Sequence, residues 1–127
     1  MNKREIGKRG EEIALEYLKK NKYKIIFKNY RTNFGEIDLI AINKKFLVFI
    51  EVKMRKKDSM VNVLYSVNKD KQEKIIKVAE EFLQTHQEFK NYDIRFDTVL
   101  IEGEDENRAV TIIKNAFLAD KKINGVF

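Results

Sequence analysis

Residues 35–53 read GEIDLIAINKKFLVFIEVK, and this stretch determines how the rest of the chain is interpreted. Two predominantly apolar runs, 37–42 and 46–54, flank a short turn at 43–45, so we expect them to pair as a β-hairpin. Because both runs are nearly continuous, the two strands are expected to be buried on both faces.

The pattern on either side of this hairpin predicts one α/β domain spanning 1–127. Apolar residues at helical spacing predict helices over about 4–20 and 68–89. Further strands are predicted at 23–30, 94–101 and 109–113. The resulting order, α-β-β-β-α-β-β, favours a mixed central sheet of about five strands flanked by helices. The core is expected over about 4–118, with a loose C-terminal tail and an irregular loop at 56–68 that could gate a site.

Composition excludes several classes of function. The chain has 127 residues, 43% of them hydrophobic, no cysteine and a single histidine. Disulfides, thiolate catalysis and cysteine-based zinc sites are therefore excluded, and multi-histidine metal sites are excluded as well. His86 in the second helix and Asp97 in the fourth strand are expected to make structural hydrogen bonds. The longest apolar run, 46–50, is too short to span a membrane, so a soluble cytoplasmic protein is expected.

The positive charge of the chain is concentrated in its first half. The net charge is +6, which alone is weak evidence for a polyanionic partner. Residues 1–60 hold 16 Lys and Arg against 8 Asp and Glu, giving +8, whereas residues 61–127 hold 10 against 12, giving −2. The half that contains the central hairpin is therefore the half suited to nucleic acid.

Four charged residues interrupt the apolar strands of the hairpin. Glu36 and Asp38 share a face of the first strand, and Glu51 and Lys53 share a face of the second. A charge in a buried strand costs several kcal/mol unless it is paired or binds a metal. The pattern suits metal-assisted phosphodiester hydrolysis, but a structural salt bridge from Lys53 to Glu51 or Asp38 is an equally open alternative.

In the catalytic interpretation, Asp38 and Glu51 hold Mg²⁺ or Mn²⁺, because hard cations prefer carboxylate oxygens and keep some waters. The metal polarises the phosphate and lowers the pKa of a bound water. Lys53 orients the attacking water or stabilises the developing charge. No small-molecule cofactor is expected.

The stretch Asp38, twelve further residues and then Glu51-Val52-Lys53 resembles the PD-(D/E)xK nuclease pattern of the restriction-endonuclease-like fold, a three-layer α/β/α architecture. Ile37 stands where that pattern nominally has proline. The segment is also similar to archaeal Holliday junction resolvases. Over about residues 4–118 the chain more closely resembles the YraN family of small bacterial predicted endonucleases, through the motifs GKRGE (7–11), FGEIDLIA (34–41), FIEVKxR (49–55), SV (66–67) with Lys71, and RFD (95–97).

This resemblance implies further residues of the site. A glutamate on the first helix of the resolvases completes their metal site, and Glu11 matches that position, with Gly7 expected to let the helix pack closely. The resemblance implies that Glu36 belongs to the motif, as a ligand, a carboxylate behind the ligands, or a salt-bridge partner of Arg55 or Lys53. It also implies a supporting role for polar residues that open the second helix, here Lys71 and Gln72. By analogy with the resolvases, a homodimer is implied.

The basic residues around the predicted site suit phosphate binding. Arg9, Arg31 and Arg55 are the best candidates because a guanidinium can hold phosphate through two hydrogen bonds. Further candidates are Lys8, Lys56 and Lys57.

The leading hypothesis is a metal-dependent endonuclease acting on DNA, with branched or damaged structures as targets, since no sequence-reading module fits in this length. The alternatives are a non-catalytic nucleic-acid-binding module and a subunit that guides a partner enzyme.

Overall fold

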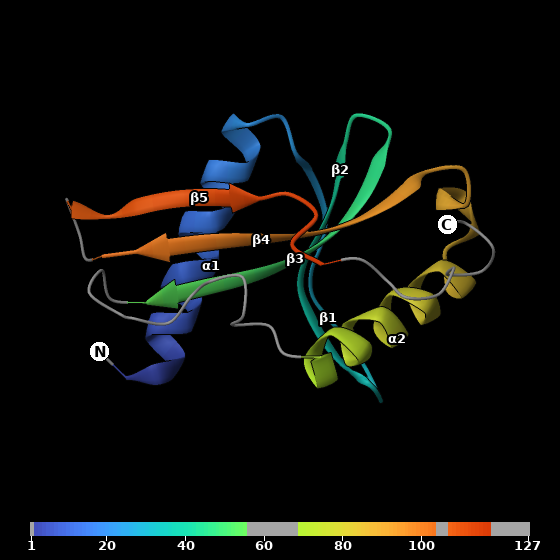
Figure 1. The fold of residues 1–127 in the computed structure, drawn as a ribbon, viewed down its shortest axis with the longest axis horizontal. Helices are drawn as coiled ribbons and strands as arrows, with labels where there is room; N and C mark the ends of the chain where they lie inside the picture. Colours follow the sequence, from blue (N-terminus) through green and yellow to red (C-terminus); the bar gives the residue numbers. More distant parts are fainter. Residues whose placement is uncertain (1, 56–68, 104–106, 118–127) are drawn as a thin grey trace.

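The computed structural model describes residues 2–55, 69–103 and 107–117. The elements follow in the order α1 (Lys3–Lys20), β1 (Lys24–Thr32), β2 (Gly35–Asn43), β3 (Phe46–Arg55), α2 (Lys69–Thr85), the 3₁₀ helix η2 (Gln87–Phe89), β4 (Asp93–Glu102) and β5 (Ala109–Ile113). The predicted order of helices and strands is confirmed (Figure 1). The predicted loop at 56–68 and the tail after 118 lie outside the described residues.

The five strands form one mixed sheet in the order β1-β2-β3-β4-β5. Strands β2 and β3 form the predicted antiparallel hairpin, in which Ala41 lies opposite Val48. Strands β3 and β4 are parallel, and α2 lies between them in the chain. The other neighbours are antiparallel. The sheet is therefore mixed because a helix interrupts the succession of strands at one point.

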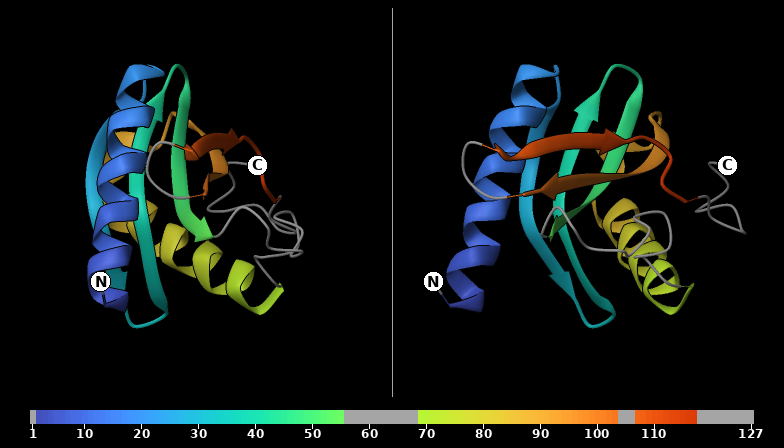
Figure 2. Two further views of the ribbon diagram at one scale, coloured as in Figure 1. Left: turned by 90° about the vertical axis from the view of Figure 1, so that its left-hand side faces the viewer. Right: turned by 60° about the vertical axis from the view of Figure 1, so that its left-hand side comes forward.

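Two separate apolar cores lie on the two faces of the sheet. The core under α2 contains Phe49 and Phe82, and the core under α1 contains Leu18 and Ile50. The views in Figure 2 show α1 and α2 on opposite sides of β1, β2 and β3. Successive residues of β3 enter opposite cores, so this strand is buried on both faces, as its apolar run predicted. The fold is a three-layer α/β/α arrangement.

Helix α1 approaches the sheet most closely at Gly10. A Cβ built on Gly10 would lie 3.2 Å from the Met54 sulfur, whereas one built on Gly7 would meet nothing within 4 Å. The expectation that Gly7 permits close packing is therefore wrong, and Gly10, one turn later, has that role. Asn2 begins the helix by accepting the backbone N–H of Glu5 at 2.9 Å.

The His86 side chain has the structural role predicted for it. Its ring stacks on Phe82 with centroids 4.1 Å apart, and its Nδ1 lies 2.9 Å from the Phe82 carbonyl oxygen. The histidine therefore completes the end of α2. Among the described residues, no helix is long and apolar enough to cross a membrane.

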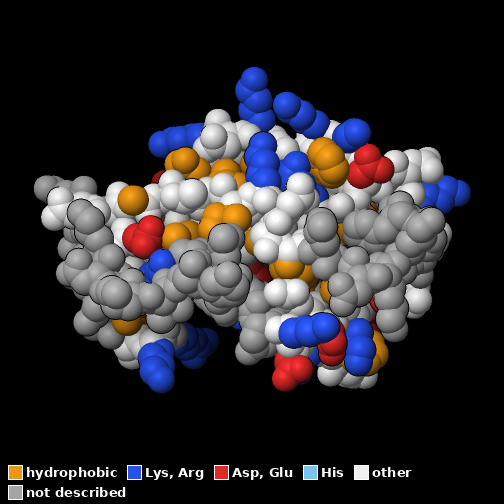
Figure 3. Space-filling model, in the orientation of Figure 1, with side chains coloured by type: hydrophobic (Ala, Val, Ile, Leu, Met, Phe, Trp, Pro, Cys, Tyr) orange, Lys and Arg blue, Asp and Glu red, His pale blue; other side chains and the backbone are white. Residues whose placement is uncertain are grey.

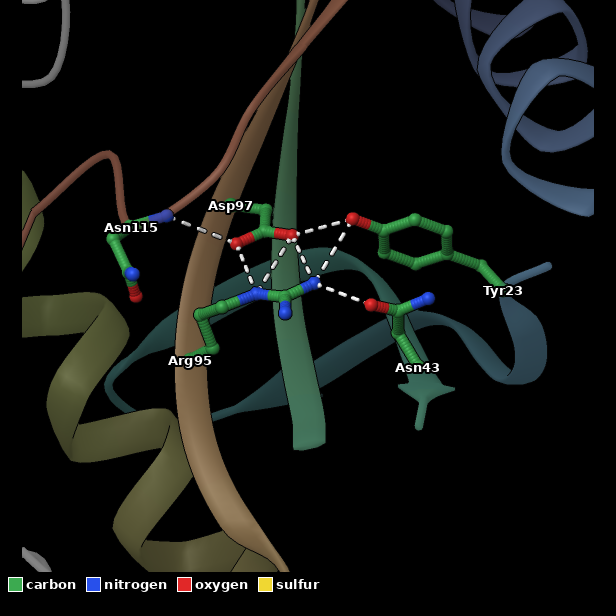
Figure 4. Close-up of polar contacts among 5 residues, drawn as sticks. All are labelled: Tyr23, Asn43, Arg95, Asp97 and Asn115. Carbon is green, nitrogen blue, oxygen red and sulfur yellow. Dashed lines mark hydrogen bonds and ion pairs between the residues drawn. The ribbon is translucent and has the colours of Figure 1, made fainter. Parts of the chain in front are cut away.

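A buried network of hydrogen bonds connects residues of β2 and β4 with residues just outside β1 and β5 (Figure 4). Both carboxylate oxygens of Asp97 accept hydrogen bonds from Arg95, and one also accepts the Tyr23 hydroxyl at 2.9 Å. Arg95 donates to Asn43 at 3.0 Å, and the Asn115 backbone N–H donates to Asp97 at 3.2 Å. The structural hydrogen bond predicted for Asp97 is confirmed. Burial and the Asp97 charge raise the pKa of Tyr23, so this phenol stays protonated as a donor.

Replacing Asp97 by Asn should destabilise the protein strongly, because the Arg95 guanidinium would be left buried without its counter-charge. We expect a loss of about 3–5 kcal/mol in the free energy of unfolding, measured by urea titration. Lys45→Gln, which removes an exposed ion pair to Asp93, serves as the control and should cost less than about 1 kcal/mol. Equal effects of the two substitutions would contradict the structural role of the network.

Candidate active site

The candidate site originates where β2 and β3 separate. Their ladder ends at the Leu39–Ile50 pair, although β3 continues beside β4 as far as Arg55. Beyond that pair, the Asp38 carboxylate accepts the backbone N–H of Val52 at 2.8 Å. If the β2–β3 ladder continued, the Val52 N–H would donate to a backbone carbonyl of β2. The Asp38 side chain accepts it instead, and β2 and β3 separate at this point.

The β1–β2 hairpin is also irregular next to the point where β2 and β3 separate. Ile37 and Ile40 pack in the same core although they are three residues apart, and Asn29 of β1 has a φ of +54°. A regular strand returns to one face every second residue, so the alternation is broken here. Asp38 and Asn29 both line a cleft on the α1 side of the sheet. The irregularity thus directs the Asp38 carboxylate toward α1, beside the opening between β2 and β3.

Glu51 reaches the opening from β3, on the face covered by α2. Leu47 and Phe49 pack in the core under α2, and alternation places Glu51 on the same face. Its side chain is only 8% exposed, and its Oε2 lies 3.1 Å from Nζ of Lys71 in the first turn of α2. Gln72, the next residue of α2, is half-buried. Lys71, predicted to support the site, is therefore in direct contact with a predicted ligand.

Lys53 interacts with Lys71. The two side chains are hydrogen-bonded to each other, and the ion pair of Glu51 is made by Lys71. Burial and Lys71 lower the pKa of Lys53. Burial also acts to lower the pKa of Lys71, but the hydrogen bond to Lys53 and the charges of Glu51 and Asp38 outweigh it, and the pKa rises. Of the two, Lys53 is therefore the more easily deprotonated and Lys71 holds its proton more tightly.

The two carboxylates of the opening repel each other. Burial raises the pKa of Glu51 to about 7, and the charge of Asp38 contributes to the rise. Burial also raises the pKa of Asp38, against the hydrogen bond from Val52 and with the added repulsion of Glu36. Two partly desolvated carboxylates in mutual repulsion are stabilised by a cation that both can reach. A positive charge beside the pair therefore stabilises it, as the Lys71 ammonium does for Glu51.

Glu11 lies on the α1 side of the opening. Its Oε2 accepts a hydrogen bond from Asn29 Nδ2 at 3.3 Å. Burial raises the pKa of Glu11, the Asn29 hydrogen bond opposes the rise, and the charges of Asp38 and Glu36 add to it. Glu11 is thus within the electrostatic reach of Asp38, as its predicted role requires.

The three predicted ligands do not form one compact cluster. Over residues 2–55, 69–103 and 107–117, no group of three or more His, Cys, Asp and Glu side chains is placed to hold a metal ion. Mg²⁺ commonly takes one or two protein carboxylates and completes its shell with water and substrate oxygens. Asp38 and Glu51 fit that donor set in charge and chemistry, and Glu11 lies to one side of them.

A cleft of about 620 Å³ opens beside α1, next to a smaller one of about 380 Å³, and Asp38 and Glu11 line both. The larger cleft has an acidic, half-buried floor formed by Glu11, Glu36 and Asp38. Its rim carries exposed basic side chains, namely Lys3, Arg4, Lys8, Lys28 and Arg31. The cleft therefore offers carboxylates inside and cations at its mouth.

The structure separates the basic residues that the sequence singled out. Lys8 and Arg31 line the larger cleft. Arg9 is exposed on α1 but lines neither cleft. Lys56 and Lys57 lie outside the described residues. Only part of the predicted phosphate-binding set therefore surrounds the carboxylates.

The ion pairs of Glu36 and Arg55 differ from those expected. An ion pair with Arg55 or Lys53 was one of three roles left open for Glu36, but its Oε2 lies 3.4 Å from Nε of Arg31, its partner across the β1–β2 ladder. Arg55 instead pairs with Glu102 of β4 at 3.5 Å, with its side chain 20% exposed. Strand register determines both pairs, because each joins residues opposite each other in neighbouring strands.

Sequence reasoning did not select Asn29 as part of the site. Asn is disfavoured in strands but is one of the few residues that adopt a left-handed backbone readily, and this was the available signal. Lys3, Arg4 and Lys28 were not among the basic residues that the sequence singled out. Their positions around one cleft depend on how α1 packs against the hairpin, which no sequence pattern specifies.

Comparison with known proteins identifies the family. The family model described as "Uncharacterised protein family UPF0102" matches residues 10–101. The chain belongs to the UPF0102 family. A UPF0102 protein of Thermodesulfovibrio yellowstonii is 42% identical over 113 residues, covering 89% of this chain and 96% of the relative. Those of Desulfosudis oleivorans and Caldicellulosiruptor saccharolyticus are 41% identical over 118 and 119 residues, covering 93% and 92% of this chain and 94% and 100% of the relatives.

The UPF0102 region includes every predicted carboxylate of the site. Glu11, Asp38 and Glu51 all fall within residues 10–101. The predicted kinship with a family of small bacterial proteins is confirmed at this level, and the description of the family states no activity.

The raised pKa of Glu51 should make the stability of this UPF0102 protein depend on pH. Glu51 ordinarily titrates at 4.5 and titrates at about 7 in the fold, so the folded state binds its proton more tightly. The contribution of this group to stability therefore falls as pH rises from about 4.5 to 7. The test measures the free energy of unfolding by urea titration in EDTA. Relative to the wild type, the free energy of unfolding of Glu51→Gln should rise by about 3 kcal/mol between pH 4.5 and pH 8.

Glu16→Gln is the matched control, since Glu16 is an exposed glutamate of α1. Its difference from the wild type should stay nearly constant over the same pH range. A Glu51→Gln difference that is equally constant would show that Glu51 is not held at a raised pKa.

Proposed function

We propose that this UPF0102 protein is a metal-dependent endonuclease of the PD-(D/E)xK type that hydrolyses phosphodiester bonds of nucleic acid. The observation that carries the proposal is the meeting of Asp38 and Glu51 at the separation of β2 and β3, with the amine of Lys53 beside them. Two mutually repelling, mostly buried carboxylates next to a lysine of lowered pKa form an arrangement of the kind found at active sites.

Asp38 and Glu51 would hold Mg²⁺ or Mn²⁺, which when bound polarises a phosphate and lowers the pKa of a bound water. The Val52 N–H fixes one oxygen of Asp38, which leaves the other oxygen free to face the opening. Asp38 lines the α1-side clefts and Glu51 lies on the α2 face, and the charge of Asp38 raises the pKa of Glu51, so the two carboxylates are close enough to interact. A phosphate entering between β2 and β3 would meet both.

Lys53 would hold or move the proton of the attacking water. Its pKa is lowered by burial and by Lys71, to which it is hydrogen-bonded. A neutral amine can accept a proton, whereas a fully charged ammonium can only donate. Lys71 holds its proton more tightly than Lys53 and forms an ion pair with Glu51. In this proposal Lys53 would act as the base and Lys71 would remain the cation at the opening.

The rim of the larger cleft supports nucleic acid as the substrate class. Exposed Lys and Arg side chains surround a floor of half-buried carboxylates. Cations at the mouth would bind phosphates on either side of the one held over the floor. The resemblance to junction resolvases adds DNA, with branched or damaged structures, to the proposal.

Binding without catalysis is the second candidate. The Lys71 ammonium already lies against Glu51, and the described part of the chain places no third ligand with this pair. A lysine that neutralises Glu51 permanently would give a basic nucleic-acid-binding surface with a structural ion pair at its centre. The same cleavage experiment separates the two functions.

Cleavage should require both carboxylates and a divalent ion. With Mg²⁺ or Mn²⁺, wild-type protein should nick or cut plasmid, single-stranded or four-way-junction DNA. Asp38→Asn and Glu51→Gln should each reduce the rate by on the order of 100-fold or more, since each removes a charge from the metal-binding pair. Glu16→Gln should cleave like the wild type.

Cleavage that survives both substitutions would mean that these carboxylates do not carry the activity. Wild-type protein that binds DNA in every metal tested but never cuts it would favour the binding module. Protein that neither binds nor cuts would leave the partner-guiding role.

Binding should depend on salt through the rim of the cleft. Arg4→Gln and Lys8→Gln should each weaken DNA binding and reduce the slope of log K against log salt by about 0.7–0.9. Lys20→Gln is the control, because it lies at the other end of α1, about 24 Å from Arg4. Fluorescence anisotropy over a range of salt concentrations gives the slopes. Equal slopes for all three variants would rule out the cleft rim as the phosphate-binding surface.

A further inference from the structure

The tip of the β1–β2 hairpin carries an exposed aromatic ring. Phe34 is 48% exposed and, with Ile6, is one of the two large hydrophobic side chains exposed among the described residues. An exposed Phe at the tip of a projecting turn contributes nothing to either core. The ring is therefore available to a ligand.

The tip is held in place. The Phe34 backbone N–H donates to Thr32 Oγ1 at 3.0 Å, and Gly35 has a φ of +150°, which a side chain would strain. A Cβ built on Gly35 would lie 3.9 Å from both Lys74 and Val78, so the turn rests directly on α2. Phe34 is thus presented on a supported turn, which reduces the entropy lost when a ligand binds.

Two lysines of α2 lie near the turn that carries the ring. The ammonium of Lys77 lies 5.8 Å from the centre of the Phe34 ring, and Lys74 is the residue against which the turn packs. Residues 69–77 of α2 hold four lysines against Asp70 and Glu73, a local net charge of +2. Figure 3 shows Lys and Arg side chains along the lower edge of this face, with acidic and hydrophobic side chains among them. The second half of the chain, net negative overall, therefore also contributes positive charge near the hairpin.

This surface is continuous with the candidate active site. Lys71, one turn before Lys74 on α2, forms the ion pair with Glu51. Along β2, Gly35 precedes Asp38 by three residues, which corresponds to about 10 Å of extended strand. Both views of Figure 2 place the hairpin tip at the same end of the molecule as the N-termini of α1 and α2. A strand leaving the opening along β2 would therefore reach Phe34 within about three nucleotides, at 3.4 Å per stacked base.

We propose that Phe34 is a stacking platform for an unpaired base, and that Lys74 and Lys77 bind the phosphates beside that base. The inference rests on the proposed function, since it assigns to the same site a preference for single-stranded or branched nucleic acid. An aromatic face stacks with any base, and flanking cations track the backbone, which is how single strands are bound without sequence preference.

A continuous duplex fits this surface less well. Bases within a duplex are already stacked on both neighbours, so the Phe34 ring finds a free base face only at an unpaired or frayed position. Asp70 and Glu73 lie among the lysines of α2 and lower the positive charge of this surface. The surface is therefore better suited to the few phosphates of a single nucleic-acid strand than to the denser charge of a duplex. Arg31, whose side chain is 75% exposed, lies two residues before Asn33 on the same hairpin and adds positive charge toward the cleft.

The test uses single-stranded oligonucleotides that contain 2-aminopurine, whose fluorescence is quenched by stacking, in EDTA so that no cleavage occurs. Wild-type protein should change the quenching, and Phe34→Ala should abolish that change and weaken single-strand binding by about 5- to 100-fold. Phe34→Tyr should restore both. Lys77→Gln should weaken binding and lower the salt slope by about 0.7 while leaving the quenching at saturation intact. Blunt duplex of the same length should bind wild type and Phe34→Ala equally.

Lys20→Gln is the control, since Lys20 is the last residue of α1 and lines neither cleft; it should bind single strands like the wild type. Three outcomes would overturn the proposal: unchanged single-strand binding by Phe34→Ala, an equal loss for duplex and single strand, or self-association of the wild type that Phe34→Ala abolishes. Failure of the nuclease is distinguishable, because it appears as the absence of metal-dependent cleavage whereas the stacking measurement needs neither metal nor cleavage.

Discussion

The hydrogen bond from the Val52 N–H to the Asp38 carboxylate is the interaction on which the site depends. It closes the end of the β2–β3 ladder without exposing a buried donor, and so allows β2 to leave a strand that continues beside β4. The opening that results brings together a carboxylate from each of two neighbouring strands. Without this bond, either the ladder would continue or a buried N–H would remain unsatisfied, which costs about 1–3 kcal/mol.

The charges at the opening stabilise one another only in part. Burial acts against both carboxylates and both lysines, and the ion pair of Lys71 with Glu51 offsets some of that cost. The same ammonium occupies a position near the oxygens that a divalent ion would use. If Glu51 holds a metal as proposed, Lys71 would stabilise the metal-free protein through the same carboxylate that binds the ion. Stability of the metal-free protein and affinity for metal would then be in competition at Glu51.

Much of the fold followed from local pattern, because apolar runs and turn residues report on burial along a single element. The central hairpin and both helices were predictable in this way, as was the placement of Asp38 and Glu51 on neighbouring strands. The partners of Glu36 and Arg55 were not, since they depend on inter-strand register. Nor could local pattern show that Gly10, and not Gly7, contacts Met54, because that depends on the rotation of α1 against the sheet. The roles assigned to the carboxylates remain predictions.

The parallel pairing of β3 with β4 has a consequence for synthesis of the chain. Phe46 pairs with Asp93, forty-seven residues later. At about 5–20 residues per second, the strand FLVFI therefore remains without its neighbour for roughly 2 to 9 s after it is translated. During that time a long, apolar, unpaired edge is exposed in the nascent chain, the kind of segment that templates aggregation. The strand that carries Glu51 and Lys53 thus keeps one apolar edge unpaired until α2 and β4 have emerged.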